Sequence, residues 1–584
     1  MSAPGSDVKT PEGYFPTLAA AASVASLAAL ASYFYTGDPD IYWHMATARA
    51  AIAARSLLPV DPFSFSVAGT PWHHKDLLAE TIFYFGFVKL GYAWFATLKF
   101  LAILSVASLL GASVPRASRG PLLLVAMAGL LVQSFLFIEQ PALFSIVLFA
   151  ATLAIEEAAW ERSADPPRLG PVLGAWVALN FAWTWLHRFS VLGHAMIFAW
   201  AALLLASRWA SAHPAGRLLF GPRAPARSLK VAALAAIASP LVALANPSGI
   251  YALSSGSTMA AHPELRQQFW EWKRAGLAEL WSAFPVALVV TAAAALWMAA
   301  RLAVALRRRD EECPVRAWHL LLGVTLTAMT LDSVRWLPYL AMVSLAVVAR
   351  LLGPEVLAVP PSRRAVLLPL LGLAMVAWYG FARREVPYAL GEDPGFAPRG
   401  AVAFARKHGL AGPIANTFDL GGYLLWTDPD AKVLVDGRNE LVYPPDFVVR
   451  CLLAEHDAPT FAAMRAADGV TWALGVNTPE QPGFAFLASD PLWSMVYWSD
   501  TAAVYVRRDA HPELEALRYR FVDPYDPVRS VLGALRTAAS PETTAAIGRE
   551  VHRMLVASPA SPRALIAQAL YNEAPARAFS AAHH

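Results

Sequence analysis

GDPDIYWHMATARAAIAARSLLPVDPFSFSVAGTPWHHKDLLAE, residues 37–80, is the stretch from which both the fold and the site are predicted. It directly follows the first apolar segment and gathers carboxylates, histidines and tryptophans where the chain first leaves that segment. Asp38 and Asp40 flank Pro39, which cannot simply continue a preceding helix. Two acids in such a turn could hold a divalent cation, because hard cations take oxygen ligands, or could act as a base. A hydrated turn that caps a helix is the alternative interpretation.

The composition is that of a membrane protein. The 584 residues are 57% hydrophobic and 15% charged, against roughly 25% charged residues in an average globular chain. The net charge of +4 is small and is sorted by side of the membrane, so the sequence indicates no nucleic-acid partner. Cys313 and Cys451 are too few for a disulfide framework, and the topology below places them on opposite sides of the bilayer.

Apolar runs long enough to cross a bilayer recur along the first two-thirds of the chain. Arginines and lysines concentrate in every second connection, which the positive-inside rule makes cytoplasmic. Eleven spans with a cytoplasmic N-terminus then put everything after about residue 383 outside. The predicted spans are 14–35, 94–113, 120–137, 141–158, 171–187, 190–207, 231–246, 281–305, 316–332, 335–352 and 365–382.

The segment 77–92 is apolar but short, and it contains Glu80 and Lys89. Counting it as a span would invert every later loop. We therefore expect an interfacial or re-entrant helix that closes the first outer loop.

With this topology, polar residues at helix ends gather on the outer face. Ionisable residues at such depths are costly and are therefore functional candidates, although any one of them alone could be a cap or a snorkelling anchor. Their coincidence on one face predicts a site there. The five positions are the loop 37–80, Glu139 with Gln140, His187 with Arg188, the loop 246–280, and Asp332 with Arg335.

Several short motifs resemble a group of bacterial polytopic membrane proteins related to the C-type glycosyltransferases (GT-C, O-mannosyltransferase-like). These motifs are the D-x-D-type turn after the first apolar helix, W-H, D-P-F-S-F and W-x-x-x-x-L-x-x-E, followed by LHRFSVLG, NPSG, FWEW, RWLPY and NTFDLGGYLLW…KVLVDGRNELVY. The superfamily includes oligosaccharyltransferases, protein O-mannosyltransferases and lipid A aminoarabinose transferases. The resemblance covers most of residues 14–510. It implies an α-helical polytopic membrane protein with a C-terminal extracytoplasmic α/β domain.

The resemblance also implies roles for individual residues. The catalytic or metal-binding acid of the first outer loop would be Asp38 or Asp40, with a divalent cation such as Mg²⁺ or Mn²⁺ as the metal. Glu139 matches a second acidic position, although the bacterial group more often has Arg-Pro there. Arg335, or else Arg188, would steady the phosphate of a lipid-linked donor.

Other residues near these positions complete the candidate site. Tryptophans at this depth could stack on a sugar or form an interfacial belt; they are Trp43, Trp72, Trp270 and Trp272. The candidate substrate-binding residues are His44, Trp72, His73, His187, Arg188, Trp272 and Arg335. Two departures from the group leave a non-catalytic member open: the pair His187-Arg188 lacks the glycine expected after the histidine, and MATARAA replaces L-R-T-G-E after W-H.

The last third of the chain predicts a small α/β domain, because helical patterns alternate from Pro398 with the strand patterns GPIANTF, AKVLVDG and VTWALGV. MVYWS and AAVYVRR then predict a closing hairpin. Asp436 and Arg438 follow a buried strand and could bind a ligand, but a turn-stabilising pair is the favoured interpretation. No nucleotide motif or zinc spacing is present. The predicted domains are a transmembrane module 1–383 with first outer loop 37–93, an α/β domain 384–510 and a helical tail 511–584.

The sequence thus predicts a multi-pass protein of a bacterial inner membrane, with the N-terminus cytoplasmic and the C-terminal domain periplasmic or extracellular. Its predicted activity is transfer of a sugar from a polyprenyl-phosphate donor at the outer face. The alternative is a non-catalytic scaffold, or a subunit of a larger complex, that binds protein partners through the α/β domain. A secondary transporter fits less well, because we find no internal repeat and the ionisable residues lie at one edge.

Overall fold

The computed structural model describes residues 15–72, 74, 76–114, 138–254, 259, 261–274, 276–308, 315–358, 360–384, 388–477 and 482–581. The chain divides into two compact units. The transmembrane unit comprises Met1–Asp38 and His73–Gly391, and the α/β unit comprises Pro39–Trp72 and Glu392–His584. The sequence analysis placed the loop 37–93 with the transmembrane module, whereas the structure groups Pro39–Trp72 with the C-terminal part.

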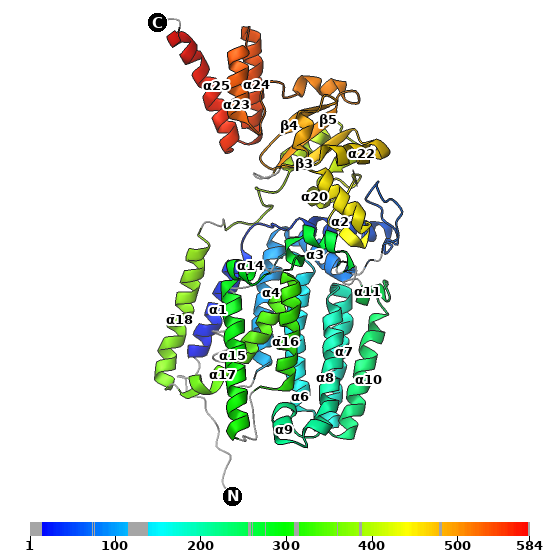
Figure 1. Cartoon of the computed structure of the whole chain (residues 1–584), viewed down its shortest axis with the longest axis vertical. Coiled ribbons are helices and arrows are strands. Elements are labelled where there is room, and N and C mark those ends of the chain that lie inside the picture. The colour runs from blue at the N-terminus through cyan, green and yellow to red at the C-terminus, as the bar shows by residue number, and fades with distance from the viewer. Residues whose placement is uncertain are drawn as a thin grey trace. The chain divides into compact units, whose positions relative to one another are not determined.

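Long helices make up the transmembrane unit and run side by side (Figure 1). Seven of the described helical segments are long and apolar enough to cross a membrane: Ala93–Ala112, Ala142–Glu161, Pro166–Leu186, Ser190–Ala210, Ala226–Ala243, Ala287–Arg308 and Val334–Leu352. Shorter apolar helical stretches, Ala21–Ser32 and Pro369–Ala382, fall within the first and last predicted spans. The predicted span 120–137 and Cys313 lie outside the described residues.

The helices of this unit are α1 (Phe15–Ser32), α3 (Leu77–Leu90), α4 (Ala93–Ala112), α6 (Ala142–Glu161), α7 (Pro166–Leu186), α8 (Ser190–Ala210), α9 (Pro214–Phe220), α10 (Ala226–Ala243), α11 (Tyr251–Ser254), α13 (Pro263–Gln268), η4 (Trp270–Trp272), α14 (Leu277–Ala283), α15 (Pro285–Arg308), α16 (Ala317–Asp332), η5 (Val334–Trp336), α17 (Leu337–Ala358) and α18 (Pro361–Ala382).

The 14 residues of α3 span only about 21 Å at 1.5 Å per residue, too short for a hydrocarbon core of about 30 Å. Glu80 in its first turn is buried, while Phe85, Val88 and Leu90 are exposed. An exposed apolar side and insufficient length agree with the interfacial helix expected from the sequence.

A buried ion-pair network joins three of the long helices. Glu157 of α6 accepts from Arg316 before α16 (2.7 Å) and from Arg350 of α17 (2.5 Å). Arg350 also donates to the carbonyl of Ser113 after α4 (2.8 Å). Both arginines were expected on the cytoplasmic side, and the carboxylate between them offsets part of their charge within the helix bundle.

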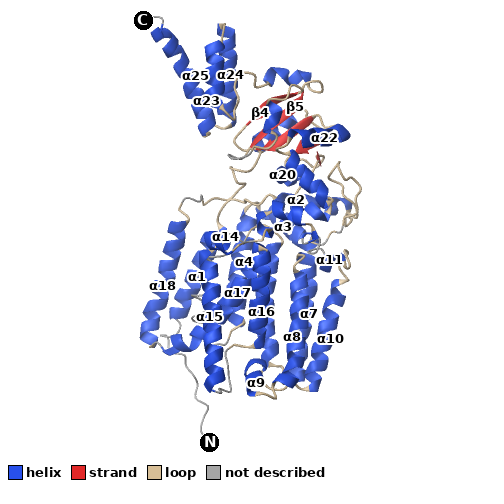
Figure 2. Ribbon diagram, in the orientation of Figure 1, coloured by secondary structure: helices blue, strands red, loops and turns tan. Residues whose placement is uncertain are grey.

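The α/β unit is built on a mixed five-stranded sheet of order β2-β1-β3-β5-β4 (Figure 2). Strands β1, β2 and β3 are parallel, while β3–β5 and β5–β4 are antiparallel, as expected for the predicted closing hairpin. The elements are α2 (Asp40–Ala54), α19 (Arg399–Lys407), β1 (Pro413–Asn416), α20 (Phe418–Thr427), β2 (Lys432–Val433), η6 (Asn439–Leu441), α21 (Pro445–Ala454), α22 (Ala458–Asp468), β3 (Trp472–Val476), η7 (Ala485–Ala488), β4 (Trp493–Trp498), β5 (Ala502–Arg507), η8 (Pro512–Leu517), α23 (Pro527–Thr537), α24 (Pro541–Ala557) and α25 (Pro562–Ala581).

One hydrophobic core serves both the sheet and the C-terminal helices. Phe461, Trp493 and Tyr505 from the sheet region pack in the same buried cluster as Val551 and Met554 of α24. The predicted separation into 384–510 and 511–584 therefore divides residues that share a core, because alanine-rich helices with few large apolar residues gave no sign of where they would pack.

The first loop is fixed to the sheet by hydrogen bonds and a buried charge. The Val433 N–H of β2 donates to the Phe63 carbonyl, and the Phe65 N–H donates back to Val433 (both 3.2 Å). Asp61 accepts from Arg438 at 2.5 Å, and both side chains are fully buried. Arg438 is also held by both oxygens of Asp436 (2.8 and 2.7 Å), which confirms the predicted turn-stabilising pair.

The carboxylates keep this guanidinium charged. Burial is the largest single influence and lowers the pKa of Arg438, but Asp436, Tyr443 and Asp61 together outweigh it and move that pKa well above its ordinary value. The D-P-F-S-F and D-G-R motifs, whose Asp61 and Arg438 are 377 residues apart in the sequence, therefore form one structural feature.

Helix α2 packs on α20 in the same unit. Its Arg49 donates to the carbonyls of Leu425 and Trp426 (2.6 and 2.8 Å), which satisfies the last turn of α20. Tyr42 meets Tyr423 edge to face at 5.0 Å. A Cβ at Gly422 would lie 3.1 Å from the Pro39 carbonyl oxygen, so this glycine allows the close approach of the two segments.

The position where an open α/β sheet usually binds a ligand is filled by the chain itself. Strands β1 and β3 are neighbours although β2 lies between them in sequence, so the sheet has a topological switch point at their carboxyl ends. There, the Glu455 carboxylate accepts the Phe418 N–H at the start of α20 (2.7 Å). Burial raises the pKa of Glu455 to about 8, partly opposed by that N–H and reinforced by Asp419.

We expect Asp61→Asn to destabilise the α/β unit. The amide of asparagine has one acceptor oxygen instead of two, and it carries no negative charge to pair with Arg438. The expected loss is about 1–3 kcal/mol of unfolding free energy, the cost of a buried polar group without its partner. Asp509→Asn is the matched control, since Asp509 pairs with Arg507 at the exposed surface. Thermal unfolding of the full chain in detergent measures both; equal melting temperatures for the two variants would contradict the role of Asp61.

Glu455→Gln should change how stability depends on pH. In the folded chain Glu455 keeps its proton up to about pH 8, whereas the unfolded chain loses it near 4.5. The stability that the protonated Glu455 gives the wild type is therefore lost as pH rises through this window. The stability of Glu455→Gln relative to the wild type should increase over the same range. Melting temperatures between pH 5 and 8.5 test this, with Glu513→Gln at an exposed position as the control. A constant difference across that range would disprove the shift.

Candidate active site

Three loops of the transmembrane unit meet at one end of the bundle. The Phe189 ring after α7 stacks on Trp336 before α17, with centroids 4.7 Å apart. Arg335 pairs with Glu271 of η4 at 2.8 Å, and Ser333 donates to the Glu271 carbonyl (2.8 Å). We call the surface formed by residues 187–189, 263–274 and 332–336 the loop end.

Arg335, the predicted phosphate ligand, lies inside an aromatic enclosure at the loop end. Its guanidinium lies 4.8 Å from the ring centroid of Trp272 and 5.4 Å from that of Phe189. Its side chain is 15% exposed and is paired with Glu271. Its charge is thus already balanced, and Trp272, a predicted sugar-binding residue, is buried beside it.

Glu139, the predicted second acid, is in a buried ion pair. Its Oε1 lies 2.5 Å from Nζ of Lys99 in α4, and the two side chains are 3% and 1% exposed. The ammonium also lies 3.9 Å from the centroid of the Phe34 ring. Lys99 was missed in the sequence because it lies within an apolar span, where no neighbouring residue indicates the distant partner.

His187 shares a hydrogen bond with a serine in the interior of the bundle. Its Nδ1 lies 2.7 Å from Oγ of Ser145 in α6, and the same oxygen accepts the Trp183 indole N–H (2.7 Å). His187 is buried, whereas the adjacent Arg188 is half-buried in the turn between α7 and α8.

The two first-loop acids belong to different units. Asp38 is buried in the transmembrane unit, and Asp40 is the first residue of α2 in the α/β unit. Asp40 accepts the Trp43 indole N–H at 3.0 Å. A Cβ at Gly437 would lie only 2.0 Å from the Asp40 carboxylate, so the glycine of D-G-R lets that carboxylate approach the backbone.

The remaining first-loop candidates are packed in the α/β unit. His44 is buried, with its ring 3.5 Å from that of Trp43. Trp72 is buried beside Phe63, and the Arg438 guanidinium lies 5.0 Å from its ring. A sugar could contact Trp72 only if this packing opened. His73 lies outside the described residues.

The structure offers little support for a preformed metal site. In the part of the chain that is described, no group of three or more His, Cys, Asp or Glu side chains could hold an ion. Oδ1 of Asp40 accepts the Trp43 indole N–H. A divalent cation at Asp38 and Asp40 stays a prediction from the sequence.

A second buried pair was not singled out by the sequence analysis. His74 Nε2 lies 2.6 Å from Oε2 of Glu80, and both side chains are buried. Ser248 of the NPSG motif donates to the His74 carbonyl (2.9 Å). The NPSG segment therefore holds the chain entering α3 in place.

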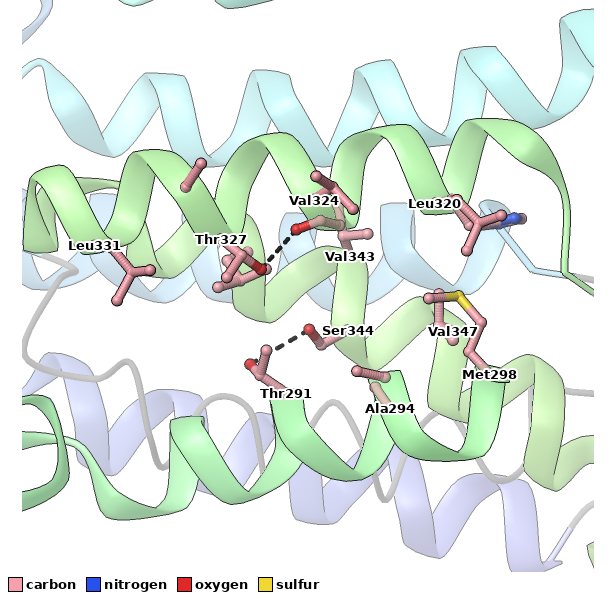
Figure 3. A pocket seen from close by; sticks show the side chains of 15 residues that line it. Thr291, Ala294, Met298, Leu320, Val324, Thr327, Leu331, Val343, Ser344 and Val347 are labelled. Carbon is pink, nitrogen blue, oxygen red and sulfur yellow. Dashed lines mark hydrogen bonds between the residues drawn. The ribbon is translucent and has the colours of Figure 1, made fainter. Parts of the chain in front are cut away.

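An apolar groove lies between α15, α16 and α17 (Figure 3). Its volume is about 340 Å³. Leu320 of α16 lies near Met298 of α15 and Val347 of α17 at one end of the groove, and Leu331 of α16 lies at the other end. The few polar groups include Thr291, whose Oγ1 lies 3.4 Å from Oγ of Ser344. At Gly323, an added Cβ would meet nothing within 4 Å. Leu331, at one end of the groove, directly precedes Asp332 of the loop end.

Solved structures share this architecture, although no protein-family model and no curated protein match the sequence. The oligosaccharyltransferase of Archaeoglobus fulgidus tethered to an NVT-sequon acceptor peptide aligns with a TM-score of 0.53 and 14% identity, over 80% of this chain and 69% of that chain. Its complex with Zn and sulfate aligns with a TM-score of 0.53 and 13% identity, over 92% and 85%. Archaeal AglB from the same organism, with an inhibitory peptide and a dolichol-phosphate, aligns with a TM-score of 0.50 and 13% identity, over 78% and 69%.

These likenesses establish the fold. The chain is a mostly helical, multi-pass membrane protein with a GT-C-like architecture and a C-terminal α/β unit, as the sequence predicted.

Proposed function

We propose that this chain is a glycosyltransferase that transfers a sugar from a polyprenyl-phosphate donor at the outer face of a bacterial inner membrane. The observation that carries this proposal is the groove between α15, α16 and α17, which is mostly apolar and adjoins the charged loop end. A polyprenyl-phosphate has the same division, since its chain lies in lipid and its phosphate at the membrane surface. An AglB structure of the same fold was solved with a dolichol-phosphate.

In the proposed reaction, an acceptor oxygen or nitrogen forms a bond to C1 of the sugar while the bond from C1 to the phosphate oxygen breaks. The acceptor proton passes to a carboxylate, which we assign to Asp38 or Asp40, and polyprenyl phosphate leaves with the bonding electrons. Cationic side chains at the loop end would stabilise the charge on the departing phosphate. We assign Glu139 a supporting role, through its pair with Lys99, and Arg335 a role near the phosphate.

A non-catalytic scaffold or subunit is the second candidate. It is favoured by a specific observation: Glu139 and Arg335, two of the predicted site residues, are already paired with Lys99 and Glu271. In that case the α/β unit would bind protein partners, and the first loop would serve to complete that unit.

We expect Gly323→Leu to weaken lipid binding without loss of stability, because the leucine side chain would fill the groove at a position where a Cβ meets nothing. The control is Gly380→Leu in α18, where a Cβ also meets nothing but which does not line the groove. Retention of polyprenyl phosphate in detergent, measured by native mass spectrometry, should fall for Gly323→Leu alone. Equal retention in both variants would mean that the lipid chain lies elsewhere.

Asp38→Asn and Asp40→Asn test the catalytic assignment. If one of these carboxylates is the base, its variant should lose about 10²-fold or more of the transfer rate, with an unchanged melting temperature. The assay follows a labelled sugar from polyprenyl phosphate to acceptors in membranes that contain the full chain. Asp430→Asn, an exposed acid of the α/β unit, is the matched control. If neither carboxylate matters for a measurable transfer, the assignment is wrong; if wild-type membranes transfer nothing, the scaffold takes its place.

A further inference from the structure

A second cavity of the transmembrane unit lies at the loop end and is basic rather than apolar. Its volume is about 450 Å³, and it is lined by Pro263, Arg266, Gln267, Lys273 and Arg274. Three of these five side chains are cations, and none of them was among the predicted site residues. We call it the basic pocket.

The basic pocket carries more positive charge than its own carboxylate can balance. Asp332 at the end of α16 faces two guanidinium groups, at 2.7 Å from Arg266 and 3.3 Å from Arg274. Lys273 is exposed and adds a third cation to the lining. Three cations and one carboxylate leave a net charge of +2. Arg335, by contrast, is matched one to one by Glu271.

The pocket is partly built before any ligand arrives. Arg266 is only 13% exposed, donates through Nε to the Trp272 carbonyl (2.5 Å) and donates to the Asp332 carbonyl as well. Arg274 is 84% exposed, and it contacts Asp332 through Nε. The fork of a guanidinium presents paired N–H donors that match two phosphate oxygens. One fixed and two adjustable cations thus surround the cavity.

The basic pocket adjoins the apolar groove. Leu331 lines the groove, and the next residue, Asp332, accepts from both arginines of the pocket. A molecule with an apolar chain and an anionic head would place each part in a matching environment.

We propose that Arg266, Lys273 and Arg274 bind the phosphate of a lipid whose chain lies in the groove, and that they favour a phosphate monoester over a diester. The identity of the lipid rests on the proposed function. A sugar-linked polyprenyl phosphate is a diester with one negative charge, whereas a phosphate monoester carries about −1.5 to −2 at pH 7. A pocket of net charge +2 therefore suits the phosphate that leaves after sugar transfer better than the donor. Negative charge develops on the phosphate as its bond to the sugar breaks. Groups that bind the product charge more tightly than the substrate charge therefore stabilise the transition state.

The test is binding of three defined ligands to the full chain in detergent: polyprenyl phosphate, its methyl diester and the uncharged polyprenol. We expect affinity to fall in that order. The double variant Lys273→Ala with Arg274→Ala should bind polyprenyl phosphate about tenfold more weakly, with polyprenol binding unchanged. Both side chains are exposed, so the fold should persist, and the melting temperature checks this.

Lys89→Ala is the matched control, because Lys89 is an exposed cation in the last turn of α3 and does not line the pocket. It should leave all three affinities unchanged. Equal binding of monoester and diester by the wild type, or equal binding of the monoester by wild type and double variant, would overturn the proposal. If inorganic phosphate binds as tightly as the lipid and is lost in the double variant, the pocket takes free phosphate and the assignment to a lipid is wrong.

The binding result separates this proposal from the proposed function. If the basic pocket binds the monoester but the chain transfers no sugar, the binding proposal holds and the proposed glycosyltransferase activity is wrong. If the double variant transfers sugar at the wild-type rate, the proposed function stands and the role of the basic pocket is wrong.

Discussion

The α/β unit depends on one buried guanidinium. Arg438 has no exposed surface, and a cation in such a position is tolerated only if its charge and its donors are satisfied. Asp436 supplies a bidentate partner from the adjacent turn, while Asp61 supplies the third bond from the first loop. The ion pair between Asp61 and Arg438 therefore does two things: it allows the arginine to be buried, and it makes the first loop part of this unit.

This constraint determines where the chain crosses between units. Residues 39–72 must reach the sheet to satisfy Arg438, so the chain enters the α/β unit after Asp38 and leaves it after Trp72. Asp38 and Asp40, two residues apart, consequently belong to different units. Any reaction that uses both carboxylates would depend on the arrangement of the two units, whereas a reaction that uses one of them would not.

The sequence predicted those parts of the fold that have a local cause. Apolar runs of sufficient length gave the membrane helices, and strand patterns gave β1, β3 and the β4–β5 hairpin, since hydropathy and alternation act within a few residues. The pair Asp436–Arg438 was predictable because its members are two residues apart. Asp61 was not predicted as their partner, because it lies 377 residues from Arg438 and nothing near it indicates that contact. The shared core of the sheet and α24 is another long-range feature of this kind.

The candidate site illustrates the same limit in electrostatic terms. Reasoning from the sequence treated each ionisable residue at the membrane edge as a functional candidate, yet Glu139 and Arg335 have partners that largely balance them: Lys99 and Glu271. A balanced pair in a low-dielectric environment attracts an external charge only weakly, because its field falls off quickly with distance. An unbalanced group keeps its field, and of the groups of described loop-end residues discussed above, the basic pocket has the largest imbalance. The net charge of a group, rather than the presence of a charged residue, is therefore the physical property that points to a ligand here. The sequence alone cannot supply it, because net charge depends on which distant residues form pairs.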